Sequence, residues 1–464
     1  MVSKACVIGL GYIGLPVAGL MAHKGILVHG VDKKREVVDL INAGKVNIIE
    51  PKLDELIRGA VLNGALKASD TPEEADVFII CVPTPFTKDK NPDLSYVMAA
   101  TRSIVPFLRP GNVVVLESTS PVGTTEEMAD LISNMRTDLA VPLSGNNMRQ
   151  LAALSGGDKS NLVHIRQIAA TSDFGSLPIY IAYCPERVIP GNIIHELACN
   201  DRVIGGINEE SAAKAGEFYS SFVRGQIIKT DARTAELCKL VENSFRDVNI
   251  AFANELSLIC DEYGVNVWEL IGIANHHPRV SILQPGPGVG GHCIAVDPWF
   301  IINAVPNEAR LLRMAREIND ARPDQVVEQV KSEALRWKKP TIACLGMSFK
   351  AGTGDFRESP AVKIIKRLAQ CEAGKLVVVD PYFTRLPAEL FGLSSVEKVD
   401  LTDALVSANI VLLLVDHPAF AAIDDELLLN KSVIDTRGLW QRNKVDRKAL
   451  AGQDCCNNPK SLAL

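Results

Sequence analysis

Short runs of apolar, often β-branched residues alternate with longer stretches of helical periodicity over the first part of the chain. Strand-like runs separated by helical segments are typical of βαβ units built around a parallel sheet. The pattern therefore predicts a doubly wound α/β domain in this part of the chain. The predicted strands span residues 5–8, 27–31, 77–82, 113–117 and 180–183.

A second series of the same kind fills the last third of the chain and predicts another doubly wound domain. Its predicted strands span residues 341–345, 376–379, 410–415 and 432–435, with a helix from about Ser359. Open parallel sheets bind ligands beyond the carboxyl ends of their strands. Two such domains are therefore compatible with two nucleotide-like ligands that face each other across a cleft.

Between the two series, residues 231–263 form one continuous helical pattern without glycine or proline, and Gly264 then supplies a stop signal. At 1.5 Å per residue this helix would be roughly 45 to 50 Å long, which suits a spine between domains or a dimer interface. The predicted fold class is α/β, with two Rossmann-like doubly wound domains joined by a central helical domain that contains the spine helix. The predicted domains span residues 1–205, 206–316 and 317–464.

Composition narrows the class of protein. With 47% hydrophobic and 22% charged residues, the chain can bury substantial cores. Its net charge of −6 and its scattered Lys and Arg residues argue against binding to nucleic acid. A bilayer-spanning helix needs roughly 18 to 20 consecutive apolar residues, and no such run occurs, so we expect no membrane helix.

The cysteines indicate a reducing compartment. There are 11 of them, an odd number, mostly in apolar contexts, and none form a C-x-x-C pair. Cys455 and Cys456 are adjacent in a polar tail, so we expect neither a structural zinc site nor any other metal. This usage favours reduced thiols and a cytoplasmic location.

A glycine motif follows the first predicted strand. Gly9, Gly11 and Gly14 form G-x-G-x-x-G, and Asp32 closes the second strand. This context is typical of dinucleotide binding, since the glycines allow backbone to approach a pyrophosphate and the acid accepts hydrogen bonds from a ribose. The aspartate favours NAD over NADP, although basic residues at 33–35 leave the second cofactor open. The alternative reading is a simple glycine-rich turn or a signal peptide.

A second glycine-rich segment carries a candidate nucleophile. Residues 284–300 read QPGPGVGGHCIAVDPWF and place Cys293 beside His292. A cysteine can be a buried core residue, but such a loop is a poor place for a core filler. A thiolate is the natural nucleophile for an aldehyde, so this loop predicts a reactive centre.

Polar residues also recur on the long helix. Lys239, Asn243 and Arg246 have the spacing i, i+4, i+7, which places them on one stripe. A solvated helix face would explain the same spacing. Because apolar residues such as Leu240 and Phe245 surround the stripe, it is equally consistent with the border of a cleft.

These residues lie in stretches by which the chain resembles the UDP-glucose/GDP-mannose dehydrogenase family from end to end. The matching stretches are VIGLGYIGLPVA, CVPTP, ESTSPVGTT, YCPERVIPGN, TAELCKLVENSFRDVNIAFANEL, GPGVGGHCIAVDP and SFKAGTGDFRESPA. The segment HHPRVSILQPGPGVGGHCIAVDPWFI is most similar to the bacterial UDP-N-acetyl-D-mannosamine dehydrogenases, which supply a uronic acid for cell-surface polysaccharides.

The resemblance implies a four-electron oxidation of a sugar C6 alcohol to an acid, with two NAD and one water consumed. It implies that Cys293 captures the aldehyde as a thiohemiacetal, which is oxidised to a thioester and hydrolysed. Lys239 and Asn243 would stabilise the oxyanion, and Lys239 and Asp297 would hold the water or base that takes the hydroxyl proton. Glu186 would assist thiohemiacetal formation and hydrolysis.

The expected binding residues extend this set. The expected cofactor-binding residues are Gly9, Gly11, Tyr12, Ile13, Gly14, Asp32, Pro83, Thr84, Ser118, Thr119 and Arg357, of which Thr119 also counts as catalytic. The expected substrate-binding residues are Glu186, Arg187, Val188, Lys239, Asn243, Arg246, Arg279, Gly290 and Lys350, with Arg437 as a weaker phosphate candidate. The resemblance also implies a homodimer through the long helix, in which Arg246 or Arg279 reaches the substrate of the second subunit.

Several alternatives remain at this stage. Ala351 and Gly352 depart from the charged pair of many UDP-glucose enzymes, which disfavours glucose, but UDP-N-acetylmannosamine, UDP-N-acetylglucosamine and UDP-N-acetylgalactosamine are not separated. Other functional classes are a non-catalytic NAD-sensing regulator and a two-electron dehydrogenase of the hydroxyacid or 6-phosphogluconate type. The polar region 135–176 is expected to contain an exposed excursion without chemistry, and 144–172 looks longer than the connection usual in the family.

Overall fold

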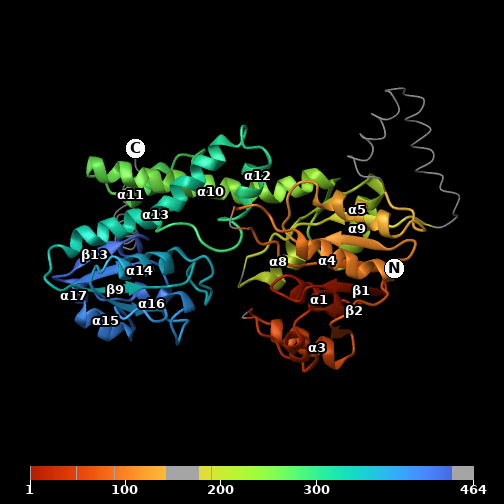
Figure 1. Ribbon diagram of the computed structural model, residues 1–464, viewed down its shortest axis with the longest axis horizontal. Helices are drawn as coiled ribbons and strands as arrows, with labels where there is room; N and C mark the ends of the chain where they lie inside the picture. The colour runs from red at the N-terminus through yellow and green to blue at the C-terminus, as the bar shows by residue number, and fades with distance from the viewer. Residues whose placement is uncertain (1, 49, 88, 143–176, 190, 442–464) are drawn as a thin grey trace, which may run out of the picture. The chain divides into compact units, whose positions relative to one another are not determined.

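The computed structural model describes residues 2–48, 50–87, 89–142, 177–189 and 191–441 (Figure 1). Most of the predicted excursion, and also Cys455 and Cys456, lie outside these ranges. The chain divides into two compact units, residues 1–241 and 242–464. Helix α10, Ala232–Tyr263, runs through the boundary between them.

The first unit is built on an eight-stranded sheet in the order β3-β2-β1-β4-β5-β6-β7-β8. Neighbouring strands are parallel except β6 and β7. The strands are β1 Lys4–Ile8, β2 Leu27–Val31, β3 Leu66–Ser69, β4 Val77–Ile80, β5 Val113–Leu116, β6 Tyr180–Tyr183, β7 Arg202–Gly206 and β8 Ile227–Asp231. All five predicted strands are confirmed within two residues. Residues 4–23 form β1, the glycine loop and the whole of α1, which does not support the signal-peptide alternative.

Helices cover both faces of this sheet, as the continuous burial of β1 requires. Ala5 and Val7 face one apolar core, which α1, α3, α8 and α9 complete, whereas Cys6 and Ile8 face a second core under α4 and α5. The helices are α1 Gly14–His23, α2 Arg35–Asn42, α3 Leu53–Leu62, α4 Ser95–Ile104, η1 Val105–Phe107, α5 Thr124–Met135, α8 Ile193–Cys199 and α9 Glu209–Ser220.

Strands β3, β7 and β8 were not predicted, because none of them has a continuous apolar run. β3 and β8 lie at the two edges of the sheet, where polar side chains are tolerated. β7 contains two glycines, which normally weaken a strand. Here they are required, since a Cβ on Gly205 would lie 2.5 Å from the carbonyl oxygen of Asp231.

The second unit contains a five-stranded sheet in the order β11-β10-β9-β12-β13, and every neighbouring pair is parallel. The strands are β9 Thr341–Leu345, β10 Lys375–Val379, β11 Val396–Lys398, β12 Ile410–Leu413 and β13 Ser432–Asp435. The helices that follow α10 are α11 Val267–Ala274, α12 Asp297–Ala304, α13 Arg310–Ala334, α14 Pro360–Gln370, η2 Ala388–Leu390, α15 Leu401–Ser407, α16 Pro418–Ala421 and α17 Asp425–Leu428. The predicted fold class is confirmed, with two α/β sheets and the long helix.

The two sheets repeat the same turn after their first strand. The N–H of Gly9 donates to the carbonyl of Val31 at 2.8 Å, and the N–H of Gly346 donates to the carbonyl of Val379 at 2.8 Å. Both glycines have φ +95°, a conformation that residues with a side chain rarely adopt. The local sequence therefore dictates the same chain reversal twice.

An aspartate at the end of the second strand completes each turn. The N–H of Leu10 donates to Asp32 Oδ2 at 3.1 Å, and the N–H of Met347 donates to Asp380 Oδ2 at 2.7 Å. Asp380 therefore occupies in the second sheet the position that Asp32 has in the first. Of these two aspartates, only Asp32 was predicted from the sequence to bind a ligand.

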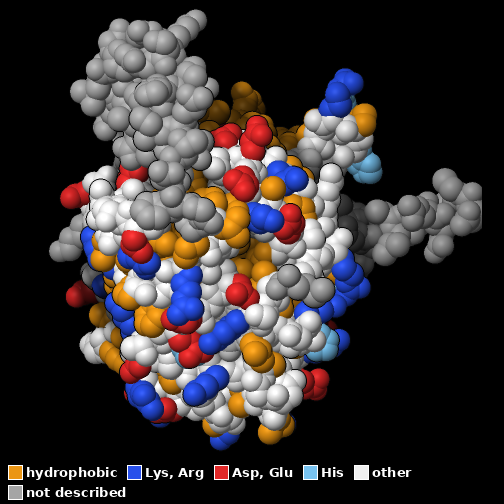
Figure 2. Space-filling view, turned by 90° about the vertical axis from the view of Figure 1, so that its right-hand side faces the viewer, with side chains coloured by type: hydrophobic (Ala, Val, Ile, Leu, Met, Phe, Trp, Pro, Cys, Tyr) orange, Lys and Arg blue, Asp and Glu red, His pale blue; other side chains and the backbone are white. Residues whose placement is uncertain are grey.

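The surface carries charges of both signs. On the face shown in Figure 2, Lys and Arg side chains are interspersed with Asp and Glu side chains rather than collected in one field. Among the described helices, none is both long enough and apolar enough to cross a membrane.

Candidate active site

The glycine loop after β1 is shaped for close backbone contact with a ligand. A Cβ on Gly9 would lie 2.5 Å from the carbonyl oxygen of Cys81, and a Cβ on Gly14 would lie 1.9 Å from that of Gly9. A Cβ on Gly11 would meet nothing within 4 Å. Gly9 and Gly14 are thus required by packing, whereas Gly11 borders open space at the start of α1, where a pyrophosphate would approach. These residues fit a dinucleotide.

Asp32 is held beside this loop. Its Oδ2 accepts the N–H of Leu10 and its Oδ1 accepts the N–H of Lys34 at 2.9 Å, and the residue is half-buried. Tyr12 is 41% exposed and Ile13 is half-buried at the start of α1. All these expected cofactor residues lie together at the carboxyl ends of β1 and β2.

The loops after β4 and β5 join the same edge of the sheet. Thr84 donates its hydroxyl to the carbonyl of Thr119 at 2.6 Å, and Ser118 donates its hydroxyl to the carbonyl of Val82 at 2.7 Å. Pro83, next to Thr84, is exposed. Because β4 is the neighbour of β1, these loops and the glycine loop meet at the point where the strand order reverses, the usual dinucleotide position in such sheets.

A lysine and a glutamate come together after β6. Lys239 Nζ donates to the backbone carbonyl of Glu186 at 2.6 Å and lies 3.5 Å from Glu186 Oε2. The two side chains are 7% and 13% exposed. The N–H of the half-buried Val188 donates to Glu186 Oε1. Arg187 donates to the carbonyl of Asp201 at 3.3 Å, which is a structural contact that the sequence did not predict.

Two buried acids of the first unit lie near these loops and were missed. Glu117 accepts the hydroxyl of Tyr219 at 2.6 Å and the thiol of Cys81 at 3.4 Å, and burial raises its pKa. Glu236, one helical turn before Lys239, accepts the N–H of Gly123 and so reaches the start of α5. Only the type of residue, an acid in an apolar context, was available as a signal.

In the second unit, Cys293 lies directly before α12 with an exposed side chain. Its carbonyl accepts the N–H groups of Val296 and Asp297 at 3.0 and 2.8 Å. Asp297 is 2% exposed and accepts a 2.6 Å hydrogen bond from the side-chain amide of Asn243 on α10. Asp297 and Asn243 are therefore in direct contact, and the backbone of Cys293 forms the turn that leads into Asp297. The catalytic roles expected of these residues stay predictions. Cysteines within the described ranges carry thiols rather than disulfides.

The glycines of the Cys293 loop are required by a second loop of the same unit. A Cβ on Gly290 would lie 2.7 Å from the carbonyl oxygen of Glu358 and 2.7 Å from Pro360. Gly291, with φ +83°, would place a Cβ 3.0 Å from the ring of Phe349. The Cys293 loop therefore packs on the loop that carries Lys350.

Lys350 lies in a closed turn after β9. The N–H of Phe349 donates to the carbonyl of Asp355 at 2.9 Å, and Lys350 Nζ lies 5.9 Å from the centre of the Phe349 ring. Arg357 places its guanidinium on the carboxylate of Asp355, with distances of 2.6 to 3.1 Å. The sequence analysis placed Arg357 at the cofactor or at a neighbouring loop, and this pair lies within its own loop.

The remaining arginine candidates are placed differently. Arg246 and Arg279 are exposed. Arg437 donates to Asp416 at 3.0 Å, and its Nη1 would lie 2.5 Å from a Cβ on Gly286, so it packs against the start of the Cys293 loop.

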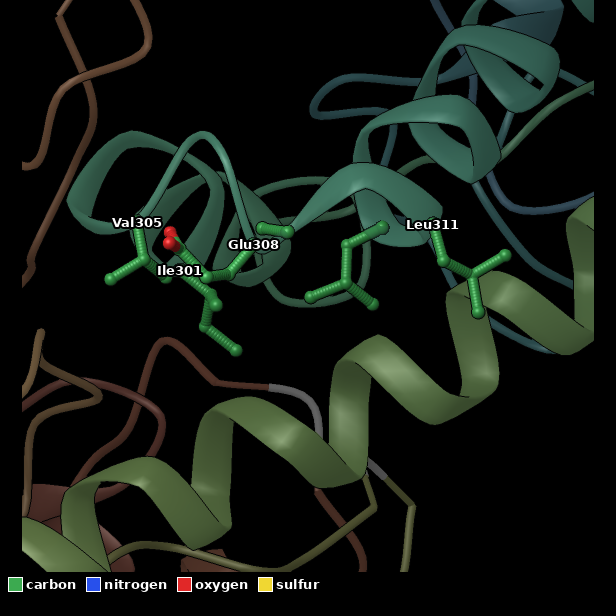
Figure 3. A pocket seen from close by; sticks show the side chains of 6 residues that line it. Ile301, Val305, Glu308 and Leu311 are labelled. Carbon is green, nitrogen blue, oxygen red and sulfur yellow. The ribbon is translucent and has the colours of Figure 1, made fainter.

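A shallow pocket in the second unit lies apart from these residues. It is lined by Ile301, Val305, Glu308, Ala309, Leu311 and Leu312 of α12, α13 and their connection. Figure 3 shows the side chains of Ile301, Val305 and Leu311 projecting to the same side. None of its lining residues is an expected site residue.

Comparisons with known proteins agree with this geometry. Sequence profiles of the UDP-glucose/GDP-mannose dehydrogenase family match the NAD binding domain at residues 3–152 and 154–223, the central domain at 233–321 and the UDP binding domain at 343–442. The NDP-N-acetyl-D-galactosaminuronic acid dehydrogenase of Ralstonia nicotianae is 53% identical over 439 residues, which cover 95% of this chain and 96% of that protein. The UDP-N-acetyl-D-mannosamine dehydrogenase of Salmonella typhimurium is 49% identical and covers 94% of this chain and 98% of its own.

A solved structure is also similar. The UDP-N-acetyl-mannosamine dehydrogenase of Staphylococcus aureus superposes with a TM-score of 0.77 at 38% identity, covering 94% of this chain and 95% of that one. Similarity thus extends over both units in sequence and in fold.

Proposed function

Because this chain belongs to the UDP-glucose/GDP-mannose dehydrogenase family and is an NAD-dependent nucleotide-sugar dehydrogenase, we propose that it oxidises UDP-N-acetyl-D-mannosamine to UDP-N-acetyl-D-mannosaminuronate. The reaction takes the C6 alcohol to a carboxylate in two oxidations. Its product would supply a uronic acid for a cell-surface polysaccharide.

One observation carries this proposal. An exposed thiol, Cys293, precedes α12 in a glycine-rich loop, and a buried carboxylate held by an amide, Asp297 with Asn243, lies four residues further on. A two-electron dehydrogenase has no use for a nucleophile at this place. A dehydrogenase that must retain an aldehyde for a second oxidation needs one.

NAD, when bound, accepts a hydride from C6 in each of the two oxidations. The residues proposed to hold it are the glycine loop of residues 9–14, Asp32, and the paired loops that contain Thr84 and Thr119. The N–H groups at the start of α1 would bind the pyrophosphate, and Asp32 would accept hydrogen bonds from the adenosine ribose.

In the first oxidation, the hydroxyl proton must leave as C6 loses its hydride. A water held near Lys239 and Asp297 is the proposed acceptor of that proton. Lys239, already 2.6 Å from the carbonyl of Glu186 and largely buried, brings a positive charge into a partly dry environment. There its stabilisation of a developing alkoxide is stronger than in water.

In the second oxidation, the Cys293 sulfur bonds to the aldehyde carbon while its proton passes to the aldehyde oxygen. Loss of the remaining C6 hydride to the second NAD, together with loss of the hydroxyl proton, would leave a thioester. Water would then displace the thiol to give the carboxylate and a proton. Lys239 and Asn243 stabilise the oxyanion of these steps, and Glu186 assists the proton transfers. The balance is two NAD and one water per sugar.

We assign residues 1–205 to NAD binding, 206–316 to dimerisation and the reactive loop, and 317–464 to binding of the UDP-sugar. Homodimerisation through α10 is supported by a stripe of exposed apolar side chains. Its members are Leu237, Val241, Phe245, Phe252, Ile259 and Tyr263, which are 42–80% exposed. At 100° per residue they fall within about 80° of arc, so one face of the helix is apolar. A cytoplasmic location stays a prediction.

A second candidate substrate is an N-acetylgalactosamine nucleotide. It is favoured by the 53% identity to a protein named for N-acetyl-D-galactosaminuronic acid, against 49% for one named for N-acetyl-D-mannosamine. N-acetylmannosamine and N-acetylgalactosamine differ in configuration at C2 and C4, which a few contacts can discriminate by about 1 to 3 kcal/mol.

The test is the NADH formed per sugar consumed, for UDP-N-acetylmannosamine, its glucosamine and galactosamine isomers and UDP-glucose, on wild type and Cys293→Ala. Two NADH per mannosamine substrate, highest kcat/KM for that substrate and an inactive variant are expected. One NADH per sugar, or turnover without the thiol, contradicts the covalent scheme and indicates a two-electron dehydrogenase. NAD binding without turnover of any of the four sugars would instead indicate a sensor.

A further inference from the structure

Behind the Cys293 loop, the second unit contains a buried row of polar side chains that the proposed chemistry does not use. Asn254 on α10 is 0% exposed. Its Oδ1 accepts the N–H of Gly286 at 2.8 Å, and its Nδ2 donates to Asn319 Oδ1 on α13 at 2.9 Å. One amide thus connects the start of the loop to the neighbouring helix.

The row ends on a carboxylate. Asn319 Nδ2 donates to Asp247 Oδ1 at 2.8 Å and to the backbone carbonyl of Asp247 at 3.0 Å. Arg316 donates to the same Oδ1 at 2.5 Å. Asp247, Arg316 and Asn319 are each 1% exposed. The charged groups are therefore paired with each other inside the protein, as buried charges must be.

The carboxylate determines which way both amides point. Asp247 can only accept, so Asn319 must turn its NH2 toward it and its oxygen toward Asn254. Asn254 then turns its own NH2 toward Asn319 and its oxygen toward Gly286. Each donor in such a series polarises the next, and a reversed amide at any place would set two donors or two acceptors against each other.

The loop needs such an anchor because it is long for the distance that it spans. Asn254 binds Gly286 near the start of the loop, and Asn243 binds Asp297, the first residue of α12. On α10 these asparagines are about 16 Å apart. A chain of the same number of residues, fully extended, would reach about 36 to 40 Å, so its ends alone do not fix its path.

Further contacts hold Gly286 and the residues that follow it. Arg322 Nε donates to the carbonyl of Gly286 at 3.1 Å, so both backbone groups of Gly286 are bonded. Gly288 lies against Pro323, where a Cβ would come within 3.2 Å of the ring. The position of Gly286 therefore determines how the following glycines enter their packing sites, and with them where Cys293 stands.

We propose that Asn254 is a positioning residue, which with Asn319 and Asp247 fixes Gly286 and thereby the path of the loop to Cys293. Its amide contacts Gly286 and Asn319, so we assign it no contact with substrate or cofactor. This inference rests on the proposed function only in calling Cys293 the nucleophile.

The test combines two readouts on the full-length protein. Asn254→Ala removes both amide contacts, and hydrogen exchange of the peptide 284–296 should become at least about tenfold faster. The kcat for NADH formation should fall about tenfold to a hundredfold, as expected for a misplaced reacting group, while KM for NAD stays within about twofold. Asn42→Ala, which breaks a two-bond amide contact to Ala68 in the first unit, is the matched control and should leave exchange of 284–296 unchanged.

Moving the carboxylate from one end of the row to the other tests whether the direction of its hydrogen bonds matters, or only its packing. Asn254→Asp should be more damaging than alanine, because it sets a carboxylate oxygen against Asn319 Oδ1. The double variant Asp247→Asn/Asn254→Asp allows Asn319 to turn over, so that it donates to the new carboxylate and accepts from the new amide. Its oxygen then faces the backbone carbonyl of residue 247, and Arg316 loses the Asp247 carboxylate and keeps that of Asp320, so part of the lost kcat should return. If Asn254→Ala does not fold, an active double variant supports the proposed role of the row, and an inactive one overturns it.

Unchanged exchange in Asn254→Ala overturns the proposal, and so does faster exchange with an unchanged kcat. A double variant no better than Asn254→Asp also overturns it. Turnover by Cys293→Ala would instead contradict the proposed nucleophile, whereas hydrogen exchange would still report whether Asn254 anchors the loop. The two failures are therefore distinguishable.

Discussion

The carboxylate of Glu236 on α10 accepts both the backbone N–H of Thr125, at 2.8 Å, and its hydroxyl, at 2.6 Å. Glu236 also accepts the N–H of Gly123, so it satisfies the first amides of α5, which have no partner within the helix. An ion pair between Arg233 and Glu126 lies beside it. The helix that carries Lys239 is thereby joined to the segment that follows Thr119.

This acid predicts a pH dependence of stability. Burial raises the pKa of Glu236 to about 7 from 4.5, and the donors from Thr125 and Gly123 only partly offset it, while nearby Glu126 adds to the rise. The native state therefore holds a proton that the unfolded chain releases between pH 4.5 and 7. The contribution of Glu236 to stability is full below the lower value and falls as pH rises, by about 3 kcal/mol in total.

Glu236→Gln removes this titration. The thermal midpoint of wild type relative to the variant should decline from pH 5 to pH 8, with most of the change completed near pH 7, as followed by circular dichroism. Glu255→Gln, an exposed change on the same helix, is the control and should follow wild type at every pH. Parallel curves for wild type and Glu236→Gln would contradict the buried, titrating acid.

A second prediction concerns cofactor choice. Asp32→Asn removes the charge that would repel a 2′-phosphate and weakens the acceptor for Leu10 and Lys34. Hydrogen bonds to charged groups are worth about 1.5 to 3 kcal/mol, so kcat/KM for NAD should fall about tenfold to a hundredfold. The ratio of kcat/KM for NAD to kcat/KM for NADP should fall as well. Steady-state kinetics with both cofactors measures this.

The control for that change is Asp39→Asn, an exposed acid on α2 that pairs with Arg35. This variant should change neither kcat/KM for NAD nor the preference for NAD over NADP. An unchanged preference for NAD in Asp32→Asn would show that the basic residues at 33–35, or other groups, make the choice.

A third prediction concerns Asp380 and binding of the UDP-sugar. Its Oδ2 accepts the N–H of Met347 and lies 3.4 Å from Nε2 of the buried His417. His417 Nδ1 accepts the N–H of Gly352 at 3.3 Å, two residues after Lys350. Asp380→Asn should therefore raise KM for the UDP-sugar by about tenfold and leave KM for NAD unchanged. A rise in both constants would indicate general loss of structure rather than a displaced Lys350 loop.

The sequence predicted those parts of the fold whose cause is local. Central strands such as β4 and β12 are continuous apolar runs, and the turn at Gly9 requires glycine whatever surrounds it. Edge strand β11 has only three residues, one of them Glu397, so its local pattern resembles that of a loop. Pairing with β10 alone makes it a strand.

The candidate site divides in the same way. Cys293 and the glycine loop were recognisable because their residue types are unusual at those places. Glu236 and Asn254 were not, because each acquires its role from a partner far along the chain, 111 residues away for Thr125 and 32 for Gly286. A single acid or amide on a helix carries no sign of such a partner.

The last prediction concerns the apolar stripe of α10. Phe252 is 50% exposed at the middle of the stripe, and the helix spans about 48 Å. Packing against the same helix of a second copy would therefore remove this side chain from solvent. Phe252→Lys places a charge in that contact, and desolvating an unpaired charge costs several kcal/mol. The proposed dimer should therefore dissociate, which light scattering after gel filtration would show as a mass half that of wild type.

Leu335→Lys is the matched control, because Leu335 follows α13 and is 87% exposed but lies off the stripe. It should remain dimeric. If Arg246 or Arg279 acts on the substrate of the second subunit, the monomeric Phe252→Lys variant should lose turnover while it still binds NAD, since the glycine loop and Asp32 belong to one chain. A monomer with full activity would support α10 as the interface but refute the shared site. A variant that stays dimeric would place the interface elsewhere than on α10.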